Sequence, residues 1–242
     1  MEEAVPKPIF ESKTNNRLRI FFAGHQPKRY AKDWPSAQQD ITNITGENYK
    51  NAMLTVLAST DKDPGYGTLR ILTPQSAVHA DGAIYHSDEP AAFMFQTADC
   101  PFLIVQDDVT GKVAMGHCGK YAMKACVTGH PCGDMVSTIL SHFRDTDRVN
   151  LSAYITAGIC GQCYKHEQDV SQVESFYGAI DHGEDRSQGE LNLIRRIKHG
   201  LRHEGVLEVN IEIDGRCTRD TPELSSYRRG DPHRSSIVVL VN

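Results

Sequence analysis

The stretch Thr97-Ala98-Asp99-Cys100-Pro101 is followed by an apolar run over residues 102–106, a polar turn, a second apolar run over residues 112–116, and then His117-Cys118-Gly119. Two apolar runs joined by a short polar turn predict a β-hairpin. If Gln106 faces Gly111 across the turn, antiparallel pairing places Cys100 opposite His117. The thiol and the imidazole then meet at the open end of the hairpin.

Two chemistries suit a cysteine opposite a histidine. Directly opposed residues have Cα atoms about 4.5 to 5.5 Å apart, so both side chains can bind one zinc ion, with His79 as the candidate third ligand. Alternatively, His117 lowers the pKa of Cys100 and makes it a nucleophile for an acyl or amide carbon. A third interpretation is purely structural, with both side chains packed in the core. Spacing alone does not separate these alternatives.

The rest of the chain predicts strands interleaved with helices. Helical spacing of apolar residues indicates one helix from Gly46 to Leu57 and another over residues 191–201, which ends near Gly205. Residues 129–133 interrupt a further helix over 121–143, and residues 24–43 and 178–189 have the composition of loops. Further strands are expected at residues 17–22, 92–95, 151–156, 207–213 and 236–241. The expected fold is α/β (α+β): one domain over residues 1–242, with a mixed sheet and flanking helices.

Composition restricts the partners and the location. The 242 residues carry 26 Lys and Arg against 31 Asp and Glu, a net charge of −5, and such a chain lacks the cationic surface that nucleic acid requires. Residues 1–13 contain no signal-peptide core, and no apolar run approaches the roughly 20 residues that span a bilayer. Seven cysteines in such a chain are expected to be reduced. We therefore expect a cytoplasmic protein that binds neither nucleic acid nor membrane.

Several further residues suit binding or positioning. Asp99 could orient a metal-binding histidine or act as a turn residue, and one of Arg228 and Arg229 could bind phosphate. Cys160 and Cys163 form a single C-x-x-C, which we interpret as a turn near the site, with a redox or metal role as the alternative. The group Cys118, Cys126, His130 and Cys132 is dense enough to suggest a second metal site. Its spacing follows no standard zinc finger, so we prefer to interpret it as an insertion with incidental thiols.

Four elements of this sequence, in the same order, resemble those of the YfiH-like family. Its members are also called laccase-domain or multicopper polyphenol oxidase-like proteins and purine nucleoside phosphorylases. The elements are Thr97-Ala98-Asp99-Cys100, His117-Cys118-Gly119, Gly158-Ile159-Cys160-Gly161-Gln162-Cys163-Tyr164, and Cys217-Thr218 with Ser226-Tyr227-Arg228-Arg229. Lys120 and Tyr121 replace the Trp and Arg that commonly follow the family's H-A-G element. The resemblance implies a fold similar to that of bacterial toxin and chemotaxis deamidases, which use a Cys–His pair.

The resemblance also implies a zinc site. Its His, Cys and His ligands correspond here to His79, Cys100 and His117, with His86 and then His25 as substitutes for the first. Copper is the weaker alternative, because a single site lacks the several copper centres that oxygen reduction needs.

The implied activity is zinc-dependent purine nucleoside phosphorolysis, which converts adenosine or inosine and phosphate into base and ribose 1-phosphate. Arg228 would bind the phosphate, and Cys100, His117 and Asp99 would be the catalytic residues. Adenosine deaminase activity is implied as well. One alternative is a cysteine hydrolase, amidase or deamidase that uses Cys100 and His117, including a role in editing peptidoglycan precursors. The other is a metal-binding domain without turnover.

Overall fold

The computed structural model of the chain describes residues 8–11, 18–30, 33–56, 69–71, 77–123, 134–166, 168–178 and 183–242. Their strands form two six-stranded mixed sheets. Sheet 1 has the order β1 (Phe10–Glu11), β2 (Leu18–Gln26), β12 (Arg234–Val241), β7 (Ala91–Thr97), β3 (Ala52–Val56), β5 (Ala77–His79). Sheet 2 has the order β11 (Ile211–Ile213), β10 (Leu151–Ile155), β8 (Phe102–Asp107), β9 (Val113–His117), β6 (Gly82–Tyr85), β4 (Leu69–Ile71).

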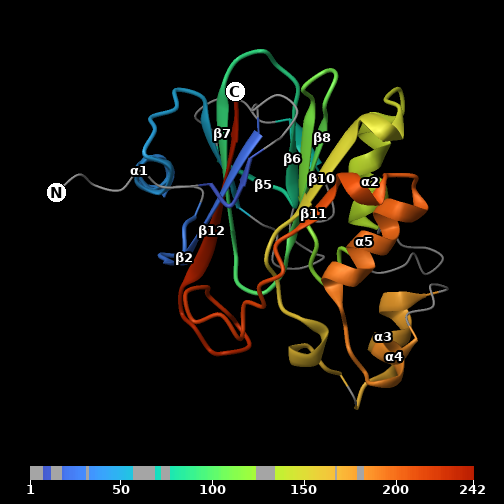
Figure 1. The fold of residues 1–242 in the computed structure, drawn as a ribbon. Helices are drawn as coiled ribbons and strands as arrows, with labels where there is room; N and C mark the ends of the chain where they lie inside the picture. The colour runs from blue at the N-terminus through green and yellow to red at the C-terminus, as the bar shows by residue number, and fades with distance from the viewer. Residues whose placement is uncertain are drawn as a thin grey trace.

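Helices cover the outer faces of the two sheets, which gives four layers (Figure 1). The α-helices are α1 (Trp34–Thr45), α2 (Met135–Leu140), α3 (Val170–Tyr177), α4 (Glu184–Ser187) and α5 (Leu193–His203). The 3-10 helices are η2 (Ser141–Phe143), η3 (Arg148–Asn150), η4 (Gly161–Cys163) and η5 (Glu208–Asn210). One apolar cluster lies between the sheets, a second joins sheet 1 to α1, and a third joins sheet 2 to α2, α3 and α5.

The sequence of β12, a central strand of sheet 1, does not alternate between apolar and polar residues. β12 pairs with β2 on one side and with β7 on the other, and seven of its eight residues are buried. Because α1 and sheet 2 cover the two faces, the strand is apolar along most of its length. The mixed α/β class expected from the sequence is confirmed, although the strands are divided between two sheets.

The two predicted helices have different outcomes. The helix over residues 191–201 is confirmed as α5, and Gly205 beyond it has a left-handed φ of 90°. The prediction of a helix from Gly46 to Leu57 is wrong, because the segment contains β3, which pairs in parallel with β5 and β7. Its apolar residues fit a strand buried on both faces as well as a helix. Leu57 lies outside the described residues.

Other boundaries also differ from the prediction. Residues 24–43, expected as a loop, contain most of α1, which ends at Gly46 with a φ of 75°. Residues 178–189 contain α4, and the strand expected from residue 207 begins only at Ile211, after η5. The predicted interruption of a helix at 129–133 lies outside the described residues.

The hairpin of β8 and β9 is confirmed, but its predicted register is wrong. Gln106 pairs with Val113 rather than with Gly111, and Phe102 pairs with His117. The Asp107 carboxylate accepts hydrogen bonds from the amide and hydroxyl of Thr110, and Gly111 adopts a φ of 73°. These contacts stabilise a longer turn. The shift by two positions keeps every side chain on its predicted face of the sheet.

Candidate active site

The site lies where β7 leaves sheet 1 and β8 enters sheet 2. β7, β3 and β5 run parallel, so their C-terminal ends share one edge of sheet 1. A cavity of about 440 Å³ opens at this edge. Its lining includes Thr55, Cys100, His117, Ile159, Tyr164 and Arg228. The two anchor residues of the predicted hairpin therefore lie together in its wall.

Cys100 and His117 are in direct contact although they are not cross-strand partners. The Cys100 thiol lies beside the imidazole of His117 and interacts with it. Gly119 makes room for this contact, because a Cβ there would lie 2.9 Å from His117 Nε2 and 3.2 Å from Cys100 Sγ. Cys100 lies two positions before Phe102, the residue that pairs with His117, so its thiol still reaches the ring.

Asp81 lies on the other side of the imidazole. Its Oδ1 is 3.5 Å from His117 Nδ1, and its backbone carbonyl accepts a 2.7 Å hydrogen bond from the His117 amide. Burial lowers the pKa of His117, but the neighbouring Cys100 and Asp81 side chains outweigh burial and raise the pKa to about 10. A carboxylate behind a histidine fixes the orientation of the ring. Sequence reasoning missed Asp81, because only the pairing of β6 with β9 brings it to His117.

Asp99 has a different environment from the one expected of a metal-orienting carboxylate. Its Oδ1 accepts a 2.8 Å hydrogen bond from the Thr218 hydroxyl, and its Oδ2 accepts one of 2.9 Å from the Arg228 amide. Its carbonyl also accepts a bond from the Ile159 amide at 2.8 Å. Asp99 therefore holds together the segments that form the cavity wall.

His79 lies at the same edge of the sheet but apart from the Cys–His pair. It ends β5, is exposed, and pairs with Val56 of β3. β5 is two strands from β7, a separation of roughly 10 Å. The ligand atoms of His79, Cys100 and His117 do not all lie within 4.8 Å of one another in the structure. The set of three zinc ligands thus stays a prediction.

The two substitute histidines lie elsewhere. His86 lines a separate cavity beside the β8–β9 turn. The Nε2 of His25 is 2.7 Å from the carbonyl oxygen of Pro222, and its backbone has a left-handed φ of 55°. Neither lines the cavity that contains Cys100.

The cavity carries four cationic side chains: Lys28, Arg29, Arg228 and Arg234. The guanidinium carbon of Arg228 lies 4.8 Å from the centre of the Tyr164 ring, so the ring positions this cation. Arg29 is paired with Asp40 at 2.7 Å. Arg229 is turned away and donates to backbone carbonyls and to Asp231. Sequence reasoning singled out Arg228 but missed Lys28 and Arg234, because no motif marks them.

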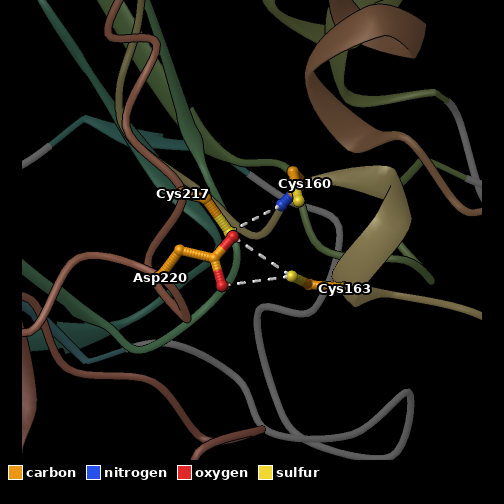
Figure 2. Close-up of side chains that lie close together, drawn as sticks. All are labelled: Cys160, Cys163, Cys217 and Asp220. Carbon is orange, nitrogen blue, oxygen red and sulfur yellow. Dashed lines mark hydrogen bonds between the residues drawn. The ribbon is translucent and has the colours of Figure 1, made fainter.

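A second group of ligand atoms lies close to this wall. Cys160 and Cys163 belong to the segment around η4, whereas Cys217 and Asp220 come from a turn near the C-terminal end, and the four side chains point toward one another (Figure 2). One ligand atom from each lies within 4.8 Å of the other three, so the group could hold a metal ion. It is the only such group of three or more among the described residues. The C-x-x-C stands out in the sequence, but Asp220 could not be predicted as its partner, because it lies 57 positions from Cys163 and only the bridge between Gly158 and Cys217 brings the two segments together.

The remaining cysteine group is only partly described. Cys118 is fully buried, and burial, followed by the charge of Asp134, raises the pKa of its thiol. Cys126, His130 and Cys132 lie outside the described residues. Nothing in the structure therefore tests a metal site there.

The family model described as "Multi-copper polyphenol oxidoreductase laccase" matches residues 47–239. The chain belongs to this laccase-domain family, whose members are enzymes.

Solved structures show the same fold. The Bacillus licheniformis hypothetical protein YfiH is 17% identical with a TM-score of 0.66, over 91% of this chain and 85% of its own. YlmD from Geobacillus stearothermophilus is 16% identical with a TM-score of 0.64, over 100% of this chain and 98% of its own. A Neisseria meningitidis protein is 21% identical with a TM-score of 0.52, over 69% of this chain and 66% of its own. None of the curated proteins compared with the chain matches it. No helix within the described residues is both long and apolar enough to cross a membrane.

Proposed function

We propose that the chain is a zinc-dependent purine nucleoside phosphorylase. The observation that carries this proposal is the contact between Cys100 and His117 in the wall of a cavity that also presents cationic side chains. The pair supplies two soft or borderline zinc ligands, and the cations suit the second substrate, phosphate. Family membership supports the assignment.

The residues at the cavity fit a zinc ion by donor chemistry. Cys100 Sγ and His117 Nε2 would hold it. His79 is the third ligand that the family resemblance implies, and because it lies apart from the pair at the same sheet edge, it would have to move toward them to bind. When bound, zinc supplies a Lewis acid that polarises an oxygen or nitrogen atom of the substrate. Asp81 holds the ring of His117 from behind, so that Nε2 faces the cavity.

The two substrates would occupy different walls. Arg228, held over the Tyr164 ring, would bind the phosphate through its planar fork, assisted by Lys28. The purine would lie against the apolar lining formed by Leu54, Ile159 and Leu193. The enzyme would thereby place the anion beside the sugar carbon and exclude water from it.

The test is base release by the zinc-loaded chain from adenosine and inosine, with and without phosphate. We expect release of base that requires phosphate, in equal amount to ribose 1-phosphate, and that is lost after chelation and in Cys100→Ala. Inosine formed from adenosine would reveal the accompanying deaminase activity. Bound zinc without any of these products would contradict the proposal and indicate a metal-binding domain without turnover.

A second candidate function is favoured by one observation. Cys100, His117 and Asp81 follow one another in the order of a cysteine nucleophile, its base and the carboxylate that orients the base. Such a site would hydrolyse an amide without zinc. Hydrolysis of a glutamine-containing peptide that survives chelation and is abolished by thiol alkylation would establish this function in place of phosphorolysis.

A further inference from the structure

The cluster of Cys160, Cys163, Cys217 and Asp220 is not used by the proposed reaction. We propose that these four side chains bind one Zn²⁺ ion in a closed, structural site, separate from the Cys100–His117 pair. The inference does not depend on the proposed function, because it concerns different ligands and a different role.

The donor set selects the metal. Three thiolates and one carboxylate favour zinc over magnesium or calcium, which prefer oxygen ligands. Four protein ligands complete a tetrahedral zinc site and leave no open position for substrate, so the site would be structural. The spacing supports this interpretation, because C-x-x-C at 160–163 is matched by C-x-x-D at 217–220.

The positions of the ligand atoms already suit a tetrahedron. The Sγ of Cys163 is 3.4 Å from Asp220 Oδ2, and all four ligand atoms are mutually within 4.8 Å. Zn–S bonds of about 2.3 Å place the sulfurs of a tetrahedral site about 3.8 Å apart. Only small side-chain adjustments are needed to receive the ion.

A backbone amide points at one of the sulfurs, as amides do around thiolate ligands. The Cys160 amide donates to Cys217 Sγ at 3.4 Å, and the Cys163 amide donates to the Cys160 carbonyl at 3.1 Å, which fixes the turn between the two cysteines. Amide donors stabilise negative charge on sulfur and orient a metal ligand. The amide that faces Cys217 therefore suits a thiolate bound to a cation.

The site would fasten two segments behind the cavity wall. Ile159 and Tyr164 flank the first ligand pair and line the cavity, and Thr218 lies within the second and donates to Asp99. An isolated parallel bridge between Gly158 and Cys217 joins the two backbones here. A zinc ion would add a strong link between segments that lie far apart in the chain.

The test is the zinc content of the full chain in matched variants, measured by mass spectrometry of the metal. We expect Cys163→Ser and Asp220→Ala to lose one equivalent of zinc that Cys100→Ala keeps. Asp220→His should restore it, because imidazole is a good zinc ligand. The matched control is Asp88→Ala, which removes an exposed carboxylate before the start of β7, far from the cluster in the sequence. Loss of this zinc should also lower the midpoint of thermal unfolding.

Cobalt substitution separates this site from the catalytic one. Co²⁺ at the cluster should give a sulfur-to-metal charge-transfer band with the intensity of three thiolates, whereas Co²⁺ at Cys100 alone would give that of one. Cys100→Ala should therefore keep most of the band.

Three outcomes would overturn the proposal. The first is an unchanged zinc content in Asp220→Ala, which removes an exposed side chain and should fold even if Cys163→Ser does not. The second is iron in place of zinc. The third is a disulfide among the three cysteines in protein purified without oxidant, shown by peptide mapping. A phosphorylase that works normally in a variant without this zinc would leave the proposed function intact, so the two proposals fail separately.

Discussion

Asp99 and Thr218 are 119 positions apart in the chain, and the Thr218 hydroxyl donates a 2.8 Å hydrogen bond to the Asp99 carboxylate in a buried environment. The same carboxylate accepts from the Arg228 amide. The residue before Cys100 thus holds the C-terminal part of the cavity wall.

Thr218→Val should destabilise the protein by about 1 to 3 kcal/mol, because it leaves a buried carboxylate oxygen without its donor. Chemical unfolding followed by circular dichroism measures this loss. Thr218→Ser keeps the hydroxyl and serves as the matched control. Equal stability of the Val and Ser variants would mean that the hydrogen bond contributes nothing.

Gly119→Ala should disable the site while the fold remains. The new Cβ would lie 2.7 Å from His117 Cε1 and would separate the ring from Cys100. A misplacement of this order costs about 100-fold in rate. Gly215→Ala is the control, since nothing lies within 4 Å of its added Cβ. Turnover with adenosine and phosphate compares the two, and wild-type turnover in Gly119→Ala would contradict the described contact.

Asp81→Asn should lower zinc affinity or turnover about 10- to 100-fold, because carboxylates behind metal-binding histidines have effects of this size. The amide keeps the volume but loses the charge that faces His117 Nδ1. Zinc competition titrations and turnover rates measure the change, with Asp88→Asn as the exposed control. An Asn variant as active as wild type would remove Asp81 from the site.

Arg228→Lys should raise the KM for phosphate more than it lowers kcat, because lysine keeps the charge but loses the bidentate fork and the stacking on Tyr164. Arg229→Lys should leave this KM unchanged and lower stability instead, since Arg229 donates to carbonyls of its own turn. The reverse pattern would exchange the roles of the two arginines.

The Asp107 carboxyl should make the stability of the folded protein depend on pH in the acidic range. Burial raises the pKa of its carboxyl, but hydrogen bonds from Thr110, Val109 and Thr146 outweigh burial and lower it. A carboxyl with a lowered pKa in the folded state stabilises the protein above its unfolded pKa of about 3.9, and this contribution is lost as the pH falls through the folded value.

Asp107→Asn should therefore remove part of the stability at pH 7 and flatten its decline between about pH 5 and pH 3. Unfolding free energies of both proteins across this range are the measurement. Parallel curves for wild type and variant would show that Asp107 does not contribute to the acid sensitivity.

The fold class could be predicted from the sequence because apolar residues recur at clear helix or strand spacing in the longer elements. α5 combines strong amphipathic spacing with an asparagine cap and a following glycine, and the β8–β9 hairpin has two apolar runs around a polar turn. β3 could not be distinguished from a helix, because a strand buried on both faces has no alternation to detect. Helix α1 was missed because Pro and polar residues dominate residues 24–43, a composition that is typical of loops.

The site was only partly predictable. The Cys100 and His117 motifs stand out in the sequence, and the structure brings them together through a different register from the predicted one. Asp81, Lys28 and Arg234 depend on tertiary pairing between distant strands, which no local pattern records. The approach of the C-x-x-C segment to the C-x-x-D segment could not be predicted for the same reason, since a parallel bridge between Gly158 and Cys217 brings them together.

The central position of β12 has a consequence for synthesis. β12 joins β2 to β7, yet it follows β7 by more than a hundred residues in the chain. While a ribosome is still making residues 234–241, both neighbouring strands expose unpaired apolar edges, which are prone to aggregate. The pairing that protects these two edges therefore cannot form until β12 has been synthesised.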